Sequence, residues 1–342
     1  MNGFAWGRSK TISDAAAGAS MTVAEAMTNA PDVIAHGQRS IVMAGGVDLL
    51  DLLKEDLLAP GLVLSLRDIP ALGGISEEAS GGCRVGPMST LAEIADHPLL
   101  RARYPALADA ARVSASPQIR RMATLGGNLL QRPRCWYFRA AAFRCSRKGG
   151  SHCFAMFGEN QYHAVFDNIP CAIVHPSTSA TALVALGATI ELTSAMGAVR
   201  TVLLEDFFVL PMKDVRRENE LQPHEIVTAI HLPPVSTGMR MAHLKQGEKD
   251  SFDWPLADVA VVLNIDQNGA CARASIVLGA AAPAPHRAKA AEAILAGQRV
   301  DDGKINAAAT AALKGATPLA KNAYKLPLFE ALVRRALRQA LT

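Results

Sequence analysis

Residues 123–139 read ATLGGNLLQRPRCWYFR, so that a glycine pair between two apolar runs leads directly into an arginine-rich stretch. Glycine has no Cβ, and the backbone N–H groups of Gly126 and Gly127 can therefore approach an anionic ligand closely. Thr124 and Asn128 add a hydroxyl and an amide to the same turn. This chemistry suits a phosphate group, although most glycine pairs are simply turns.

A second glycine turn, Ala44-Gly45-Gly46-Val47-Asp48, ends an apolar run and precedes a helical pattern. The N-terminus of a helix favours negative charge. Neither turn matches the GxGxxG or the Walker pattern, which argues against Rossmann-type and P-loop sites. Two such turns in one α/β domain could bind the two phosphates of a dinucleotide.

The first two thirds of the chain alternate strand and helix patterns, which is typical of α/β architecture. The predicted strands are residues 40–46, 61–66, 83–88 and 188–194. The predicted helices are residues 47–57, 89–100, 104–115 and 179–187.

After Pro233-Pro234 the pattern changes to α+β. Residues 257–280 contain two apolar strands joined across Asn268-Gly269, the dipeptide most typical of a hairpin. Helical patterns follow at 286–297 and 326–341, and the second aligns one apolar face. The residues of that face are Leu328, Leu332, Ala336 and Ala340. We therefore expect a domain boundary near residues 233–238.

Composition and charge limit the function classes. The chain has 342 residues and a net charge of +4, which is too modest to indicate nucleic-acid binding. No apolar run of about 18 residues is present, so we expect no membrane span. The N-terminus lacks an apolar signal region, which predicts the cytoplasm, although co-export with a partner that carries a signal would place the chain in the periplasm.

Charge is unevenly distributed. Residues 112–158 contain nine Lys or Arg residues and no Asp or Glu. Such a block is either a solvated loop or lies near fixed negative charge.

Four of the six cysteines fall in or near this basic block, whereas Cys83 and Cys271 lie in strand-like runs that predict buried apolar positions. The four are Cys135, Cys145, Cys153 and Cys171. They lack the tight C-x2–4-C pairs of zinc sites, and the N-terminus gives no sign of an oxidising compartment. Iron–sulfur clusters tolerate varied spacing, and their negative charge would partner the basic block. His152 is a competing ligand, and the spacing alone leaves these readings open.

No catalytic constellation stands out, since both the G-x-S-x-G and the H-E-x-x-H motifs are absent. We therefore name no catalytic residue.

Several stretches together resemble a known family. These are MAGGVDLLDLLKE, RVGPMSTLAEIADHPLL, ATLGGNLLQRPRCWYFR, PCAIVHPSTSATALVALGATIEL, VLGAAAPAPHRAKAAEAILAG and NAYKLPLFEALVRRAL. In this order they resemble the FAD-binding (medium) subunit of xanthine dehydrogenase-family molybdenum hydroxylases. RCWYFR and the cysteine loop make the chain most similar to the FAD/[4Fe–4S] subunit of bacterial aldehyde oxidoreductases.

The resemblance implies a fold in two domains. Residues 1–234 would form a two-part FAD-binding domain of the PCMH (vanillyl-alcohol oxidase-like) type, with a cluster-binding insertion at about 131–171. Residues 238–342 would form a smaller α+β domain like the C-terminal domain of the CO dehydrogenase flavoprotein.

The resemblance also implies site residues. The two glycine turns would hold the FAD pyrophosphate, with Thr90, Lys245 and Asp253 nearer the flavin. The FAD-binding residues would be Ala44, Gly45, Gly46, Val47, Asp48, Leu49, Thr90, Thr124, Gly126, Gly127, Asn128, Lys245 and Asp253. The [4Fe–4S] ligands would be Cys135, Cys145, Cys153 and Cys171.

The chain departs from the family at two positions. Val47 replaces the usual Thr and removes one hydroxyl donor to phosphate, a loss on the order of 1 kcal/mol. Thr178 stands where the family often has an Asp that helps to hold the cofactor.

The implied function is that of an oxidoreductase subunit in a heterotrimer. A molybdopterin-binding large subunit would hydroxylate an aldehyde or an N-heterocycle, and a [2Fe–2S] small subunit would pass the electrons to FAD in this chain. FAD would deliver them to an external acceptor. The alternatives are a self-contained FAD-dependent oxidoreductase of the same fold and a zinc-stapled, non-catalytic binding protein.

Overall fold

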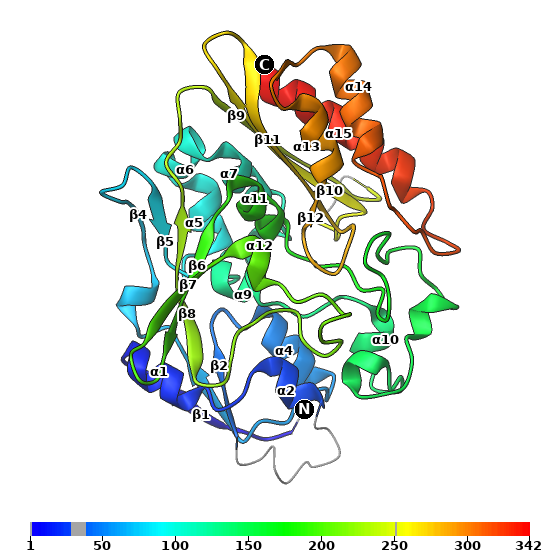
Figure 1. The fold of residues 1–342 in the computed structure, drawn as a ribbon. Coiled ribbons are helices and arrows are strands. Elements are labelled where there is room, and N and C mark those ends of the chain that lie inside the picture. Colours follow the sequence, from blue (N-terminus) through cyan, green and yellow to red (C-terminus); the bar gives the residue numbers. More distant parts are fainter. Residues whose placement is uncertain (1, 29–38, 250–251) are drawn as a thin grey trace.

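The computed structural model describes residues 2–28, 39–249 and 252–342 (Figure 1). Among these residues, no helix is both long and apolar enough to cross a membrane. Three sheets and the helices around them make up the fold, of which the first sheet is parallel and the other two are antiparallel.

The first sheet is small and parallel, with strand order β1-β3-β2. Its strands are β1 (Ala5–Arg8), β2 (Ser40–Met43) and β3 (Leu62–Ser65). The helices of this part are α1 (Ile12–Gly18), α2 (Val23–Thr28) and α4 (Val47–Lys54). The predicted strands at 40–46 and 61–66 and the helix that starts at Val47 are confirmed. β1 was not predicted, because its residues AWGR lack an apolar pattern and are held by pairing with β3.

The second sheet is antiparallel, with strand order β4-β5-β8-β6-β7. Its strands are β4 (Ile75–Glu77), β5 (Cys83–Val85), β6 (Thr189–Ser194), β7 (Val199–Leu203) and β8 (Glu225–Leu232). Its larger helices are α5 (Leu91–Asp96), α6 (Pro98–Arg103), α7 (Pro105–Arg112) and α11 (Thr178–Leu186). The single helix predicted at 89–100 is wrong, because Pro98 disfavours helical geometry at His97 and starts a separate helix.

Short helices lie in the connections. They are η1 (Pro70–Leu72), α8 (Pro117–Arg120), α9 (Leu125–Leu129), α10 (Trp136–Arg139), η2 (Ser146–Lys148), η3 (Phe154–Met156) and α12 (Leu204–Phe207). The cysteine-rich loop, residues 131–171, contains α10, η2 and η3, and its Phe138 and Cys145 pack into the core of the first sheet.

The third sheet carries the predicted hairpin, which is confirmed with Gly269 at φ 78° in the turn. Its strands are β9 (Met239–Gln246), β10 (Ala257–Ile265), β11 (Ala270–Gly279), β12 (His286–Arg287) and β13 (Gln298–Arg299). Its helices are α13 (Lys289–Leu295), α14 (Asp302–Ala311) and α15 (Lys325–Leu341). Leu332, Ala336 and Ala340 of the predicted α15 face are buried, and Phe329 and Val333 widen it.

Helix α11 joins the second and third sheets, since it contacts α7 on one side and β10 and β11 on the other. Every residue of α11 is buried for this reason. One apolar core therefore runs from Val85 and Ile190 to Val262 of β10. The strands change sheet between β8 and β9, and the division into domains 1–234 and 238–342 stays a prediction.

Gly279 lies at this junction, and an added Cβ would come within 2.2 Å of Thr181 Oγ1 and 2.3 Å of Asp258 Oδ2. We expect Gly279→Ala to lower the free energy of unfolding by about 1–3 kcal/mol through overpacking. Urea denaturation measures the change, and Gly3→Ala, which adds its methyl to open space, is the control. Equal midpoints for both variants would contradict the packing.

His175 makes stability depend on pH. Burial lowers the pKa of its imidazole from 6.5 to about 4. Between these values the unfolded chain binds the proton and the folded chain does not, so stability falls as pH falls. From pH 6.5 to pH 5 this residue should cost about 2 kcal/mol of unfolding free energy. His175→Phe, which keeps a ring against Phe208, should lose that much less over the same range in urea denaturation; a pH response equal to wild type refutes the assignment.

Candidate functional site

A cavity of about 450 Å³ lies between the two glycine turns and the segment that joins β9 to β10. All the predicted FAD-binding residues except Thr90 line it. They are Ala44, Gly45, Gly46, Val47, Asp48, Leu49, Thr124, Gly126, Gly127, Asn128, Lys245 and Asp253. Segments that are far apart in the sequence thus meet at one site.

The two glycine turns pack directly against each other. An added Cβ on Gly45 would lie 1.9 Å from the carbonyl oxygen of Met122, just before the second turn. Gly46 has φ 81°, which favours glycine, and it begins α4. The absence of side chains therefore allows the turns to form one continuous cavity wall.

The second turn keeps hydrogen-bond donors for a ligand. The Thr124 hydroxyl accepts a hydrogen bond from the Gly127 N–H at 3.3 Å, so its own proton can still be donated. The Asn128 side-chain oxygen accepts from Ser177 Oγ at 2.6 Å, which leaves its NH₂ end to donate. Donors of this kind suit a phosphate.

Thr90 lies apart from the cavity lining. Its hydroxyl and the Glu93 carboxylate form a capping box at the start of α5. The sequence pattern contained this alternative, since S/T-x-x-E is typical of a helix start. The structure gives Thr90 a structural role, and a flavin contact stays a prediction.

Asp48 binds arginines of the cysteine-rich loop. Its carboxylate accepts the Arg132 N–H at 2.8 Å and forms ion pairs with Arg134 at 2.9 Å and Arg139 at 2.7 Å. The guanidinium of Arg134 also stacks on Trp254, 4.6 Å from the ring centre. Asp48 thus fixes the start of the loop beside the cavity, and its charge is neutralised there.

At the far side of the cavity, Lys245 donates to the carbonyl oxygen of Val113 at 3.0 Å, and burial lowers the pKa of its amine. The two departures from the family also line the cavity. Val47 presents an apolar side chain that is 39% exposed. The buried Thr178 hydroxyl bonds to Ser114 Oγ and, at 3.1 Å, to the Ala110 carbonyl, and so ties α11 to α7.

None of the six cysteines, all of which lie in the described ranges, forms a disulfide. The thiols of Cys153 and Cys171 share a hydrogen bond, which together with the charge of Arg147 lowers the pKa of Cys171 to about 6. Burial raises the pKa of Cys135 to about 12, and Cys135 and Cys145 both lie within electrostatic range of Cys171. The loop therefore brings the four thiols into one region.

The four thiols do not have the arrangement of metal ligands in this structure. Among the described residues, no three His, Cys, Asp or Glu side chains are arranged to hold a metal ion. His163, which the sequence analysis did not single out, has Nε2 3.2 Å from Cys135 Sγ. His152 instead packs against Phe154. The donor set suits an iron–sulfur cluster, whereas its geometry is not that of a loaded site.

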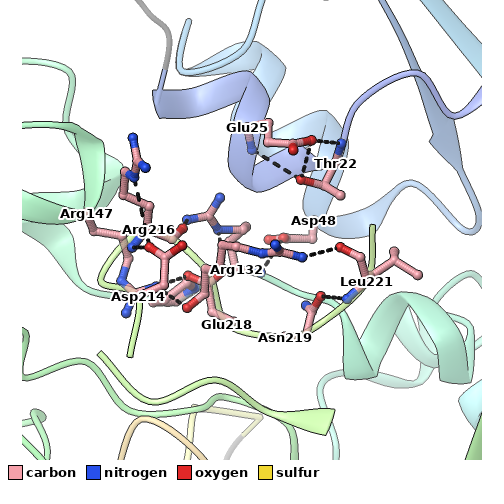
Figure 2. Close-up of polar contacts among 12 residues, drawn as sticks. Thr22, Glu25, Asp48, Arg132, Arg147, Asp214, Arg216, Glu218, Asn219 and Leu221 are labelled. Atoms are coloured by element: carbon pink, nitrogen blue, oxygen red, sulfur yellow. Dashed lines mark hydrogen bonds and ion pairs between the residues drawn. The ribbon is translucent and has the colours of Figure 1, made fainter. Parts of the chain in front are cut away.

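A buried ion triad joins the cysteine-rich loop to the segment before β8 (Figure 2). Glu218 pairs with Arg132 Nε at 2.9 Å and with Arg147 Nη1 at 2.6 Å, and all three side chains are at most 4% exposed. Arg132 and Glu218 line the cavity, and Arg147 lies close enough to Cys171 for its charge to lower the pKa of that thiol. Sequence reasoning missed Glu218, because no motif marks a carboxylate that is remote in sequence from both partners.

Comparison with known proteins identifies the family. Residues 16–235 match the FAD binding domain in molybdopterin dehydrogenase, and residues 242–340 match the CO dehydrogenase flavoprotein C-terminal domain. The chain belongs to the FAD-binding subunits of the xanthine dehydrogenase-family molybdenum hydroxylases. As a family member it is an oxidoreductase subunit that binds FAD, and the cavity is where its predicted FAD-binding residues meet.

Relatives and solved structures cover nearly the whole chain. The chain is 33% identical to the aldehyde oxidoreductase FAD-binding subunit PaoB of Escherichia coli (strain K12), over 87% of this chain and 90% of that protein. It is 28% identical to the carbon monoxide dehydrogenase medium chain of Afipia carboxidovorans, over 89% and 90%. The structure of carbon monoxide dehydrogenase from Hydrogenophaga pseudoflava aligns with a TM-score of 0.72, 26% identity, and coverage of 99% of this chain and 97% of that one.

The close contact between the two glycine turns predicts that Gly45→Ala will weaken FAD binding. Gly45→Ala places a methyl against the Met122 carbonyl, and the turns must separate. We expect the dissociation constant of FAD to rise about tenfold, equivalent to about 1.4 kcal/mol. Titration of the FAD-free chain with FAD, followed by flavin fluorescence, measures this. Gly73→Ala, with its nearest neighbour 3.5 Å away, should bind FAD as the wild type does.

Proposed function

We propose that this chain is the electron-transfer flavoprotein subunit of a heterotrimeric molybdenum hydroxylase of the aldehyde or xanthine type. A [2Fe–2S] small subunit supplies the electrons, a molybdopterin-binding large subunit carries out the hydroxylation, and an external acceptor receives the electrons. The observation that supports this most is the cavity into which both glycine turns, Lys245 and Asp253 converge.

The chain's own residues bind and enclose the cofactor. When bound, FAD supplies the two-electron redox chemistry. The backbone N–H group of Gly46, the Thr124 hydroxyl and the Asn128 NH₂ group are the donors to its phosphates, and Lys245 is the cation at the β9 side of the cavity. The stacked side chains of Arg134 and Trp254 line the cavity on the side of the cysteine-rich loop and would shield the bound cofactor from water there. This role requires no acid or base from the protein.

We further propose a [4Fe–4S] cluster on Cys135, Cys145, Cys153 and Cys171. Two features support it. Cys135, Cys145 and Cys153 each interact electrostatically with Cys171. The cations beside these thiols, Arg147 and Lys148, belong to residues 112–158, which contain no carboxylate. A thiolate-bound cluster is anionic and would balance this charge. The small rearrangement that brings the thiols to iron would accompany loading.

Placement of the complex in the cytoplasm, or in the periplasm by co-export with a partner, stays a prediction of the sequence.

The cofactor content of the chain tests both proposals. We expect one FAD and about four irons with matching sulfide per chain after anaerobic purification, with a flavin spectrum on a broad iron–sulfur absorbance. Cys135→Ser should lose the iron and keep the FAD. Cys271→Ser, outside the set and buried in β11, should keep both.

Other cofactor contents would support one of the alternative functions instead. Flavin without iron contradicts the cluster and keeps the flavoprotein. Zinc without flavin contradicts the whole proposal. Purification of the native complex with a molybdenum-containing large subunit separates the heterotrimer from a self-contained FAD oxidoreductase, which would reduce an acceptor with its own substrate in the isolated chain.

A further inference from the structure

The ion triad carries an uncompensated charge. Arg132, Arg147 and Glu218 are each at most 4% exposed, and they sum to two positive charges and one negative. Each Glu218 oxygen takes a different guanidinium, so neither arginine forms a two-pronged pair. Burial of unbalanced charge is costly. Asp48 lies within electrostatic range of Arg132, but it also pairs with Arg134 and Arg139, so the cluster keeps a net positive charge.

Unsatisfied hydrogen-bond donors indicate where this positive charge is directed. Arg147 Nε and Nη2 and Arg132 Nη1 are buried without a hydrogen-bond acceptor among the described residues. Arg147 faces the Cys171 sulfur, whereas Arg132 lines the flavin cavity. The excess charge therefore faces two places, the Cys171 thiol and the cavity.

The triad is a physical connection between these sites. Arg147 belongs to η2 of the cysteine-rich loop, whereas Glu218 comes from the segment between α12 and β8 that lines the cavity. The same segment is held to the arginines by its backbone, since Arg132 donates to the Arg216 carbonyl at 3.1 Å and Arg147 to that of Arg217 at 3.2 Å. Figure 2 draws these side chains together beside Asp48.

We propose that Glu218 and its two arginines couple the cysteine-rich loop to flavin binding, an inference that rests on the proposed FAD site. Arg147 supplies the net positive charge of the triad, and the dianionic pyrophosphate of FAD is attracted by that charge across a poorly screened interior. Arg147 also keeps one Glu218 oxygen away from Arg132, which leaves Arg132 N–H groups directed elsewhere than at Glu218. Arg147 thus acts on the flavin as a positioning residue from within the loop.

The test measures FAD affinity in the full-length chain, purified anaerobically, stripped of flavin and titrated with FAD. Arg147→Met removes the charge, balances the remaining Arg132–Glu218 pair and should weaken FAD binding roughly tenfold, a typical coupling between sites. Arg147→Lys restores the charge and should recover most of the affinity. A residue that only fills space would be replaced better by Met than by Lys.

The matched control is Arg144→Met, which makes the same substitution at an exposed arginine three residues earlier in the same loop. It should leave the FAD dissociation constant unchanged. If Arg147→Met does not fold, as judged by thermal melting, Arg147→Gln makes the same test, because it keeps amide donors and loses only the charge.

Two results overturn the inference while leaving the proposed function intact. One is wild-type FAD affinity in a folded Arg147→Met or Arg147→Gln chain, and the other is equal weakening by Arg144→Met. A wild-type chain that binds no FAD refutes the proposed function and this inference with it. Weakened FAD binding in a chain without iron supports the coupling and contradicts only the cluster.

Discussion

The carboxylate of Asp48 is the interaction on which the site depends. It follows the first glycine turn, and it holds Arg132, Arg134 and Arg139 just after the second. Residues 112–158 contain no acid, and the loop that begins there needs partners from elsewhere. Asp48 supplies one and Glu218 another. Because Gly45 allows the turns to touch, the same few residues form the cavity wall and anchor the loop.

The charges around the cavity suit the anionic phosphates of the proposed FAD site. A bare Asp48 would repel phosphate, and its arginines cancel that repulsion. The buried triad then adds positive charge behind the wall, and Lys245 adds a cation at the opposite side. The scaffold around the cavity is well packed, since α11 is buried against α7 on one side and β10 and β11 on the other, and one core includes strands of both sheets. In the proposed function the protein positions FAD, and the cofactor supplies the redox chemistry, so reactive side chains are not required.

Sequence reasoning succeeded where the signal is local. The glycine turns, the Asn268-Gly269 hairpin and the strands at β2, β3 and β6 each follow from neighbouring residues, and the structure has them. It failed where a partner is remote or a local rule was overlooked. β1 exists only through pairing with β3, and Pro98 divides a helix that the apolar pattern drew as one. Thr90 caps α5 together with Glu93, as the sequence pattern indicates, and its flavin contact stays a prediction. His163, not His152, lies at Cys135.

The sequence alone determined the family, the two glycine turns and the presence of a basic, cysteine-containing loop after the second turn. These are properties of residue order, since turn geometry and helix starts are decided within a few residues. Only the tertiary structure decided which acids neutralise the loop and that Arg147 and Arg132 share one carboxylate. It also decided that the thiols and the flavin cavity are linked through that carboxylate. Ion pairs between residues far apart in the chain depend on packing and burial, which bring Glu218 to its partners and leave no trace in local sequence.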